Sequence, residues 1–291
     1  MSRFAFRRIL CPIDFSEQST TALGLAGSLA GSLGAEVRVL HAQRFDAPVY
    51  FTSAQLQSLR KQLRRSQRAA QKFVEDFAAR HLPDIVARSV RIIEGDPVEA
   101  ILSSHRDWGA DLLVMGTHGR TGLTRIRLGS VMESVLRQMK GPMLTVGPGS
   151  TAPPGAIRRI LSPVDFSDLS REALRYSVDL AERTGAEVTA LHILGESPAD
   201  GHDQAASALC DWIPPADRNR CTLHEVVREG GTSESIVAEA RRLRAGLLVL
   251  GAQPRSYLGR LVFGSTTEAV IRTAPCPVLS LIQPSRRRTA T

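Results

Sequence analysis

Short apolar segments alternate with amphipathic segments along the first half of the chain. The apolar segments are rich in aliphatic and β-branched residues, as is typical of buried strands: RILCPI, VRVLHA, ARSVRII, DLLVM and PMLTV. The amphipathic segments between them predict helices, at 16–34, 53–81, 96–107 and 130–140. Because strand and helix alternate, we expect a parallel sheet with right-handed crossovers and helices on both faces.

The same pattern occurs a second time. Residues 7–42 align without a gap with residues 158–193 and are identical at about half of the positions, with an offset of 165 − 14 = 151. DLLVMGTHGR then aligns with GLLVLGAQPR at an offset of 251 − 116 = 135, so the second copy is shorter by 151 − 135 = 16 residues in between. The chain is therefore predicted to be α/β, with two repeated doubly wound Rossmann-like domains.

The boundaries of the two domains follow from the repeat and from a segment rich in Gly, Pro and Ser between the copies. We expect the first domain at 1–148, a linker at 149–157, the second domain at 158–284 and a basic tail at 285–291. Where the first copy has its long helix, the second copy contains three prolines, so its second helix should be short or broken.

Composition places the chain among soluble globular proteins. Of its 291 residues, 43% are hydrophobic and 23% charged, and no apolar run has the ~18 to 20 residues that a membrane span needs. The N-terminal segment lacks the pattern of a secretory signal, so we expect a cytoplasmic protein. The four cysteines have neither metal-ligand spacing nor the pattern of a disulfide framework, and we expect them to be reduced and mostly buried.

The net charge of +8 comes almost wholly from arginine. The guanidinium group suits phosphates and carboxylates, which fits an anionic partner. The basic positions are scattered over several helices and the C-terminal tail, however, and this favours solvated helix faces over a nucleic-acid groove.

The segment GTHGRTGLTRIRLGS directly follows the predicted strand DLLVM and leads into a helix. Its glycines allow the backbone to approach a ligand closely, and the first amides of the helix favour an anion. Each glycine alone could simply build a turn, and Ser130 could be a plain N-cap. Together, G-x-x-G-x9-G-S in a strand–loop–helix setting predicts a polyphosphate site, with Ser130 as a donor and Arg120, Arg125 or Arg127 nearby.

Asp14 follows the first predicted strand and would face the same cleft if the first and fourth strands are neighbours. An ionised carboxylate suits ribose hydroxyls, although a turn residue explains Asp14 equally well. His41 and His192 end the second strand of each copy, where a structural role is favoured because no nucleophile is paired with them. His118 could reach a phosphate but lacks a partner, so we predict no catalytic residue and no metal ligand.

At this point the segments RRILCPIDFS, AEVRVLH, GDPVEAI and the glycine-rich loop with its helix resemble, in order and spacing, the bacterial universal stress protein domain. The whole chain is similar to a tandem universal stress protein, with the ATP-binding pattern in the first domain. The resemblance implies an open five-stranded parallel sheet in the order 3-2-1-4-5 in each domain. It also implies ATP as the ligand of the following residues: Pro12, Ile13, Asp14, His41, Ala42, Met115, Gly116, Gly119, Gly129, Ser130 and Val131.

The second copy departs from this pattern. Its counterparts of the binding residues are Asp165, Gly251, Gly264 and Ser265. Pro254 replaces Gly119 and Tyr257 replaces Gly122, and because proline removes a donor and fills space, we expect this degenerate site to be weak or empty. The resemblance further implies that the two domains pair through their fifth strands, PMLTV and PVLSLI, whose edges would otherwise be exposed.

These observations favour a cytoplasmic regulator of the stress response that binds ATP, together with Mg²⁺, and acts through nucleotide-dependent interaction with at most slow ATP hydrolysis. We expect a homodimer and an unidentified protein partner, and neither a membrane nor a nucleic acid. A nucleotide-independent interaction scaffold is the alternative. A true ATP-dependent enzyme is less favoured, because G-x-x-x-x-G-K-[ST] and other signatures of such enzymes do not occur.

Overall fold

The computed structural model describes residues 6–43, 68–119, 128–150, 157–195, 201–252, 255–257, 260–262 and 264–283. The first repeat alternates strand and helix, as the hydrophobic pattern predicted. Its elements are β1 (Arg8–Pro12), α1 (Glu17–Leu33), β2 (Glu36–Gln43), a helical segment at 68–81, β3 (Arg88–Glu94), α3 (Pro97–Trp108), β4 (Leu112–Gly116), α4 (Ser130–Gln138) and β5 (Gly141–Val146).

The second repeat follows the same plan with a different second crossover. Its elements are β6 (Arg159–Val164), α5 (Asp168–Thr184), β7 (Glu187–Leu194), α6 (Gly201–Trp212), α7 (Pro215–Arg218), β8 (Leu223–Glu229), α8 (Thr232–Arg242), β9 (Leu247–Ala252), β10 (Arg255–Tyr257), β11 (Arg260–Val262), α9 (Ser265–Thr273) and β12 (Val278–Ile282). The crossover is divided between α6 and the four-residue α7, as the prolines of this segment led us to expect.

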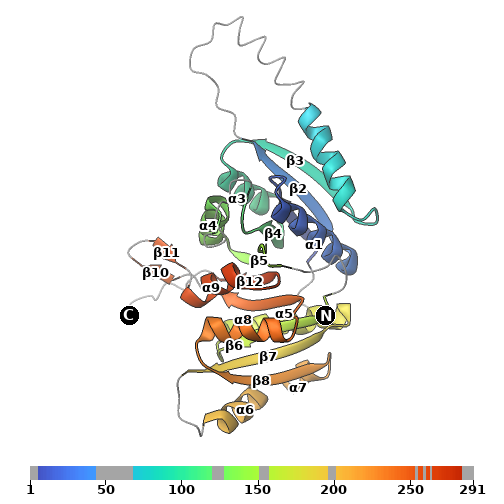
Figure 1. Ribbon diagram of the computed structural model, residues 1–291. Helices are drawn as coiled ribbons and strands as arrows, with labels where there is room; N and C mark the ends of the chain where they lie inside the picture. The colour runs from blue at the N-terminus through green and yellow to red at the C-terminus, as the bar shows by residue number, and fades with distance from the viewer. Residues whose placement is uncertain are drawn as a thin grey trace, which may run out of the picture.

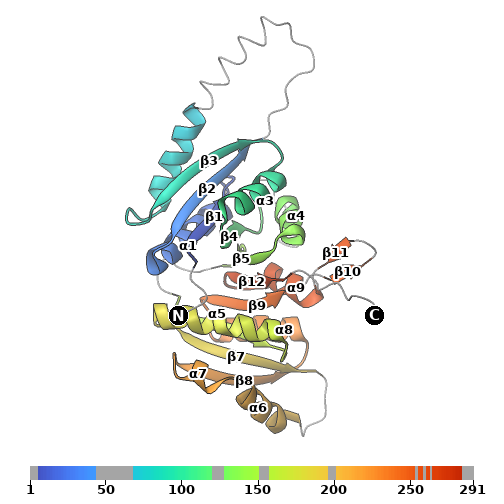
Figure 2. The ribbon, with the colours of Figure 1, turned by 180° about the vertical axis from the view of Figure 1, so that it is seen from behind.

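All the strands except β10 and β11 form one ten-stranded sheet in the order β3-β2-β1-β4-β5-β12-β9-β6-β7-β8. Each half has the order 3-2-1-4-5. The expected pairing through the fifth strands is confirmed: β5 and β12 are antiparallel neighbours, with Thr145 opposite Val278, and they join the two expected open sheets into one. Figures 1 and 2 show these two strands in the middle of the molecule. The pairing gives each fifth strand a hydrogen-bonded neighbour, which removes two exposed sheet edges.

The sheet is buried on both faces, so successive residues of a strand belong to different cores. In β1, Ile9 faces a cluster that includes α1 and α5, whereas Leu10 faces a cluster that includes α3, α4, α8 and α9. Both residues are fully buried. The helices thus cover both faces, and the strand ends remain free to carry a site.

The short antiparallel hairpin of β10 and β11 was not predicted. It lies in the part of the second repeat that corresponds to residues 120–127 of the first, and β11 lies next to α4. In the described parts of the chain, no helix is both long and apolar enough to cross a membrane.

The cysteines are free, as expected, but differ in exposure. Cys11 and Cys276 are buried, and burial raises the pKa of the Cys276 thiol to about 12. Cys210 is exposed and Cys221 is partly buried, so the expectation of mostly buried thiols holds for only part of the set.

Candidate functional site

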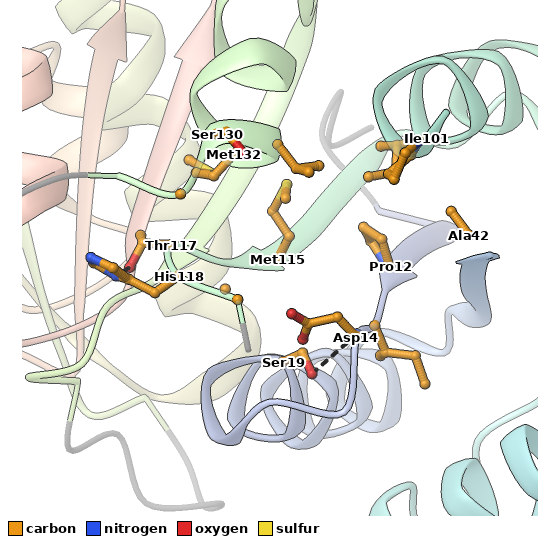
Figure 3. Close-up of a pocket in the computed structure, with 16 residues that line it drawn as sticks. Pro12, Asp14, Ser19, Ala42, Ile101, Met115, Thr117, His118, Ser130 and Met132 are labelled. Atoms are coloured by element: carbon orange, nitrogen blue, oxygen red, sulfur yellow. Dashed lines mark hydrogen bonds between the residues drawn. The ribbon is translucent and has the colours of Figure 1, made fainter. Parts of the chain in front are cut away.

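A cavity of about 540 Å³ lies in the first repeat at the carboxyl ends of β1 and β4. These two strands are direct neighbours, with Ile9 opposite Leu112, so the cavity lies where the strand order reverses. Figure 3 shows side chains from both strand ends, from α1, α3 and α4 around this space. Its lining consists of Pro12, Ile13, Asp14, Ser19, Ala42, Pro97, Ile101, Met115, Gly116, Thr117, His118, Gly119, Gly129, Ser130, Val131 and Met132.

Every residue expected to contact the ligand lines this cavity, with the exception of His41. The ring of His41 is used elsewhere: its Nδ1 lies 3.0 Å from the carbonyl oxygen of Ile13, a distance at which Nδ1–H donates a hydrogen bond. His41 therefore holds the end of β1 against β2 beside the cavity. His192 repeats the contact in the second repeat, with Nδ1 2.8 Å from the carbonyl oxygen of Val164.

Asp14 is held by a tight turn between β1 and α1. Its Oδ1 accepts hydrogen bonds from the amide of Ser16 at 3.0 Å and from the hydroxyl of Ser16 at 2.6 Å. The Ser16 hydroxyl oxygen in turn accepts a bond from the amide of Ser19 and caps α1. In Figure 3 the Asp14 carboxylate lies on the cavity side of this turn. The turn thus fixes one carboxylate at the mouth of the cleft.

The residue after Asp14 is in a conformation that is rare for a bulky side chain. Phe15 has φ 64°, in the left-handed region, which costs about 1 to 3 kcal/mol. Its ring packs on His41, with centroids 4.8 Å apart, and on Phe77 at 5.2 Å. These aromatic contacts offset the cost of the turn, so the Asp14 carboxylate is held in place by packing as well as by hydrogen bonds.

The glycines bring the loop after β4 against this turn. A Cβ at Gly116 would lie 2.9 Å from Cβ of Gln18, and a Cβ at Gly119 would lie 2.6 Å from Oδ2 of Asp14. Such distances are too short for real carbon contacts. Only glycine at position 119 allows the loop to approach the carboxylate this closely.

The opposite side of the cavity is the N-terminus of α4. Its N-cap is Gly129, which has no side chain to cap the first turn. The amide of Gly129 donates to the carbonyl oxygen of Thr117 at 2.8 Å, which ties the helix start to the loop. A helix N-terminus without a side-chain cap carries partial positive charge and free N–H donors, and Ser130 and Val131 line the cavity at this end. This end of the cavity is therefore suited to an anion.

Six residues of the lining were not among the predicted ligand contacts: Ser19, Pro97, Ile101, Thr117, Met132 and His118, the last of which was expected only to be able to reach a phosphate. Pro97 and Ile101 are one helical turn apart on α3, so a helical-face argument could have paired them with each other. Nothing in the sequence says that α3 covers the strand ends. Arg120, Arg125, Arg127 and Gly122 lie outside the described residues.

The cavity combines three chemical environments. Pro12, Ile13, Ile101 and Met115 make one part apolar, the Asp14 carboxylate borders it, and the α4 N-terminus lies at the other end. A flat apolar group, a hydroxylated group and an anion could bind in that order. Among the residues that the structure describes, no group of three or more His, Cys, Asp or Glu residues could hold a metal ion.

The second repeat keeps the acidic turn. The amide of Ser167 donates to Oδ1 of Asp165 at 3.0 Å, and Phe166 has φ 62°. Burial acts to raise the pKa of Asp165, but hydrogen bonds from Ser167 and Ser170 outweigh it and hold the pKa below its ordinary value.

The second repeat also keeps the close contact at the strand end. A Cβ at Gly251 would lie 2.5 Å from Cγ of Leu169, the counterpart of Gln18, which lies close to Gly116 in the first repeat. Gly264 is the N-cap of α9, and Ser265 begins that helix. Pro254 lies outside the described residues. The described part of the second cleft therefore has the acidic turn, the strand-end glycine and the helix N-terminus of the first.

Comparison with known proteins gives a consistent result. A model described as the universal stress protein family matches residues 5–147, 156–210 and 215–281. A universal stress protein of Methanocaldococcus jannaschii is 30% identical over 143 residues, which cover 44% of this chain and 84% of that protein. One of Mycolicibacterium smegmatis is 24% identical over 291 residues, 93% of this chain and 95% of its own. The crystal structure of a universal stress protein from Archaeoglobus fulgidus DSM 4304 has a TM-score of 0.71 at 22% identity, with 95% of this chain and 98% of that chain covered.

Proposed function

Because the chain belongs to the universal stress protein family, we propose that its first repeat binds ATP and that the bound nucleotide controls an interaction with another protein in the stress response. The observation that carries the proposal is the cavity between Asp14 and the N-terminus of α4. Its volume of about 540 Å³ lies within the range of ~300 to 1,000 Å³ that small-molecule sites occupy.

Each part of ATP has a matching part of the cavity. The adenine ring enters the apolar part formed by Ile13, Ile101 and Met115. The ribose hydroxyls donate to the Asp14 carboxylate, which is acceptor-only when ionised. The phosphates lie along the glycine loop and accept hydrogen bonds from the first amides of α4 and from Ser130.

The described residues fit a nucleotide, and the fit rests on backbone as much as on side chains. The close approach of Gly119 to Asp14 leaves no room for a side chain, and the first turn of α4 has no side-chain cap. Mg²⁺, when bound, would neutralise the phosphate oxygens. Those oxygens and water would be its ligands, since the lining offers a single carboxylate.

The function we propose is regulatory, with at most slow ATP hydrolysis. Among the described residues of the lining, we find no carboxylate or imidazole hydrogen-bonded to a nucleophile that faces the cavity. The hydroxyl of Thr117 is hydrogen-bonded to the carbonyl oxygen of Val146 and to the imidazole of His118. We further propose a cytoplasmic location and a homodimer. Light scattering of the purified chain tests the dimer.

A nucleotide-independent scaffold is the second candidate for the repeat at 158–284. The replacement of the loop glycine by Pro254 favours it, because proline removes an N–H donor and fills space that a phosphate would need. On this proposal one repeat binds ATP and the other serves protein contacts.

Calorimetric titration of the full chain with ATP, AMP and adenosine tests the function. We expect ATP to bind most tightly, AMP less and adenosine least, because each phosphate removed loses contacts with the loop and the helix N-terminus. Equal affinities would show that the α4 N-terminus does not take part. Absence of binding for all three would favour the scaffold.

A further inference from the structure

Thr117 and His118 lie in the middle of the glycine loop and are both buried, with 1% and 8% of their surface exposed. The carbonyl oxygen of Val146, at the end of β5, accepts hydrogen bonds from the Thr117 amide at 2.9 Å and from the Thr117 hydroxyl at 3.3 Å. Thr117 therefore bonds to the neighbouring strand through both of its donors.

His118 completes this arrangement. Its Nδ1 lies 2.9 Å from the hydroxyl oxygen of Thr117, so the two side chains share a hydrogen bond whose donor is set by the tautomer of His118. Figure 3 shows the imidazole directed away from the cavity. The pair thus connects the lining of the cavity to the end of β5.

The chain that leaves β5 at this point lies against the second repeat. Residues 147–150 form a turn in which the Gly147 amide donates to the Ser150 hydroxyl at 3.1 Å and the Ser150 amide donates to the Gly147 carbonyl at 3.0 Å. A Cβ at Gly147 would lie 3.8 Å from the Thr117 hydroxyl oxygen and 3.9 Å from the carbonyl oxygen of Ile271 in α9. A Cβ at Gly149 would lie 3.6 Å from the carbonyl oxygen of Ala274, the C-cap of α9.

The Thr117 hydroxyl, the 147–150 turn and the end of α9 thus lie close to one another. We propose that Thr117 is a positioning residue that couples nucleotide binding in the first repeat to the contact between the 147–150 turn and α9 of the second. This inference rests on the proposed nucleotide site. A ligand that orders the glycine loop orders Thr117, and through the Val146 carbonyl it restrains the turn that lies on α9.

The second repeat lacks the hydroxyl group that Thr117 supplies in the first. Position 117 corresponds to Ala252, at the offset 252 − 117 = 135, and alanine has no hydroxyl. The coupling is therefore a property of the first repeat alone. By linkage it acts in both directions, so a partner that binds at the end of α9 changes the affinity for the nucleotide by the same factor.

Hydrogen exchange of the full chain, with and without saturating ATP, tests the coupling in three proteins. In the wild type we expect ATP to slow exchange at the loop and the start of α4, and also at 147–150 and 271–276. In Thr117→Val, which keeps the branched shape and loses the hydroxyl, ATP should bind about five- to tenfold more weakly and protect the loop without protecting 147–150 and 271–276. Thr117→Ser retains the hydroxyl and should restore both effects.

The outcomes separate the coupling from the site itself. Protection of the loop without protection of the junction in the wild type would overturn the coupling and leave the nucleotide site intact. Undiminished junction protection in Thr117→Val at saturating ATP would also overturn it. If ATP protects neither region, the proposed function fails and the coupling fails with it. Thermal unfolding of each variant shows whether the fold is kept.

Discussion

The clefts of the two repeats are alike on one side and different on the other. Asp14 and Asp165 accept the same amide hydrogen bond at 3.0 Å, and each is followed by a phenylalanine in the left-handed region. The loops that face these turns differ, since Gly119 in the first repeat corresponds to Pro254 in the second.

This comparison shows which part of the pattern is informative about a ligand. The acidic turn joins a strand to a helix, caps that helix and packs under an aromatic ring in both repeats. It is a building unit of the fold and would be kept without a ligand. The second glycine of the loop, Gly119, occurs only in the first repeat, where a Cβ would lie 2.6 Å from Oδ2 of Asp14, and it is therefore the residue that we connect with a ligand.

The largest effect should come from exchanging this one position. Gly119→Pro adds atoms at a position where even a Cβ would lie 2.6 Å from Asp14 Oδ2, and it removes an N–H donor. The affinity for ATP should therefore fall by at least about 100-fold, or ~2.7 kcal/mol. Titration calorimetry and circular dichroism measure binding and fold. The matched control is Pro254→Gly in the second repeat, which should leave the affinity of the first site unchanged. Retained binding in Gly119→Pro would show that the nucleotide lies elsewhere.

The next effect concerns the helix N-termini. Ser130→Ala should weaken ATP binding by about 1 to 3 kcal/mol and adenosine binding much less, because the hydroxyl donates to a charged phosphate. Ser265→Ala, at the same place in α9, should have no effect on ATP affinity. Competition binding with both ligands measures the difference. Equal losses for ATP and adenosine would remove Ser130 from the phosphate site.

A smaller effect is expected at the acidic turn. Asp14→Asn keeps the shape of the side chain and loses its charge, so both ATP and adenosine should bind about fivefold more weakly through the loss of one strong acceptor. Asp165→Asn is the control in the second repeat. A loss for ATP alone would argue that Asp14 acts on the phosphates or their Mg²⁺ rather than on the ribose.

The smallest effect is a pH-dependent change in stability. Hydrogen bonds from Ser167 and Ser170 hold the folded-state pKa of Asp165 below its unfolded value, so its contribution is present above about pH 4 and is lost as the pH falls through the folded pKa. Asp165→Asn should therefore lower the free energy of unfolding by less than about 1 kcal/mol at pH 7, and by less still at pH 3. Urea unfolding at the two pH values measures it. An equal deficit at both pH values would contradict the assignment.

Much of the fold could be predicted because the sequence contains the same pattern twice. The gap-free alignment of 7–42 with 158–193 and the alternation of strand and helix are local properties of the sequence. The strand order came from the family resemblance. The hairpin of β10 and β11 was missed because each strand has three residues, too few to establish a period. The two sheets were expected to pair, but their union into one sheet depends on contacts between distant segments.

Some residues of the candidate site could likewise be predicted from the sequence, and others could not. The glycines and Asp14 could be found because backbone approach and charge are visible in residue types. Ile101 and Met132 could not, since any apolar helix residue could equally belong to the core. His41 was expected to border the pocket through its backbone and is not among the lining residues, whereas the structural role expected for its ring is confirmed by the hydrogen bond to the Ile13 carbonyl.

Native mass spectrometry of the purified chain at saturating ATP tests the central claim that the two clefts differ in nucleotide binding. We expect one ATP per chain, and none for Gly119→Pro. Two ATP per chain would contradict the claimed difference between the repeats, and no ATP on the wild-type chain would contradict the nucleotide site itself.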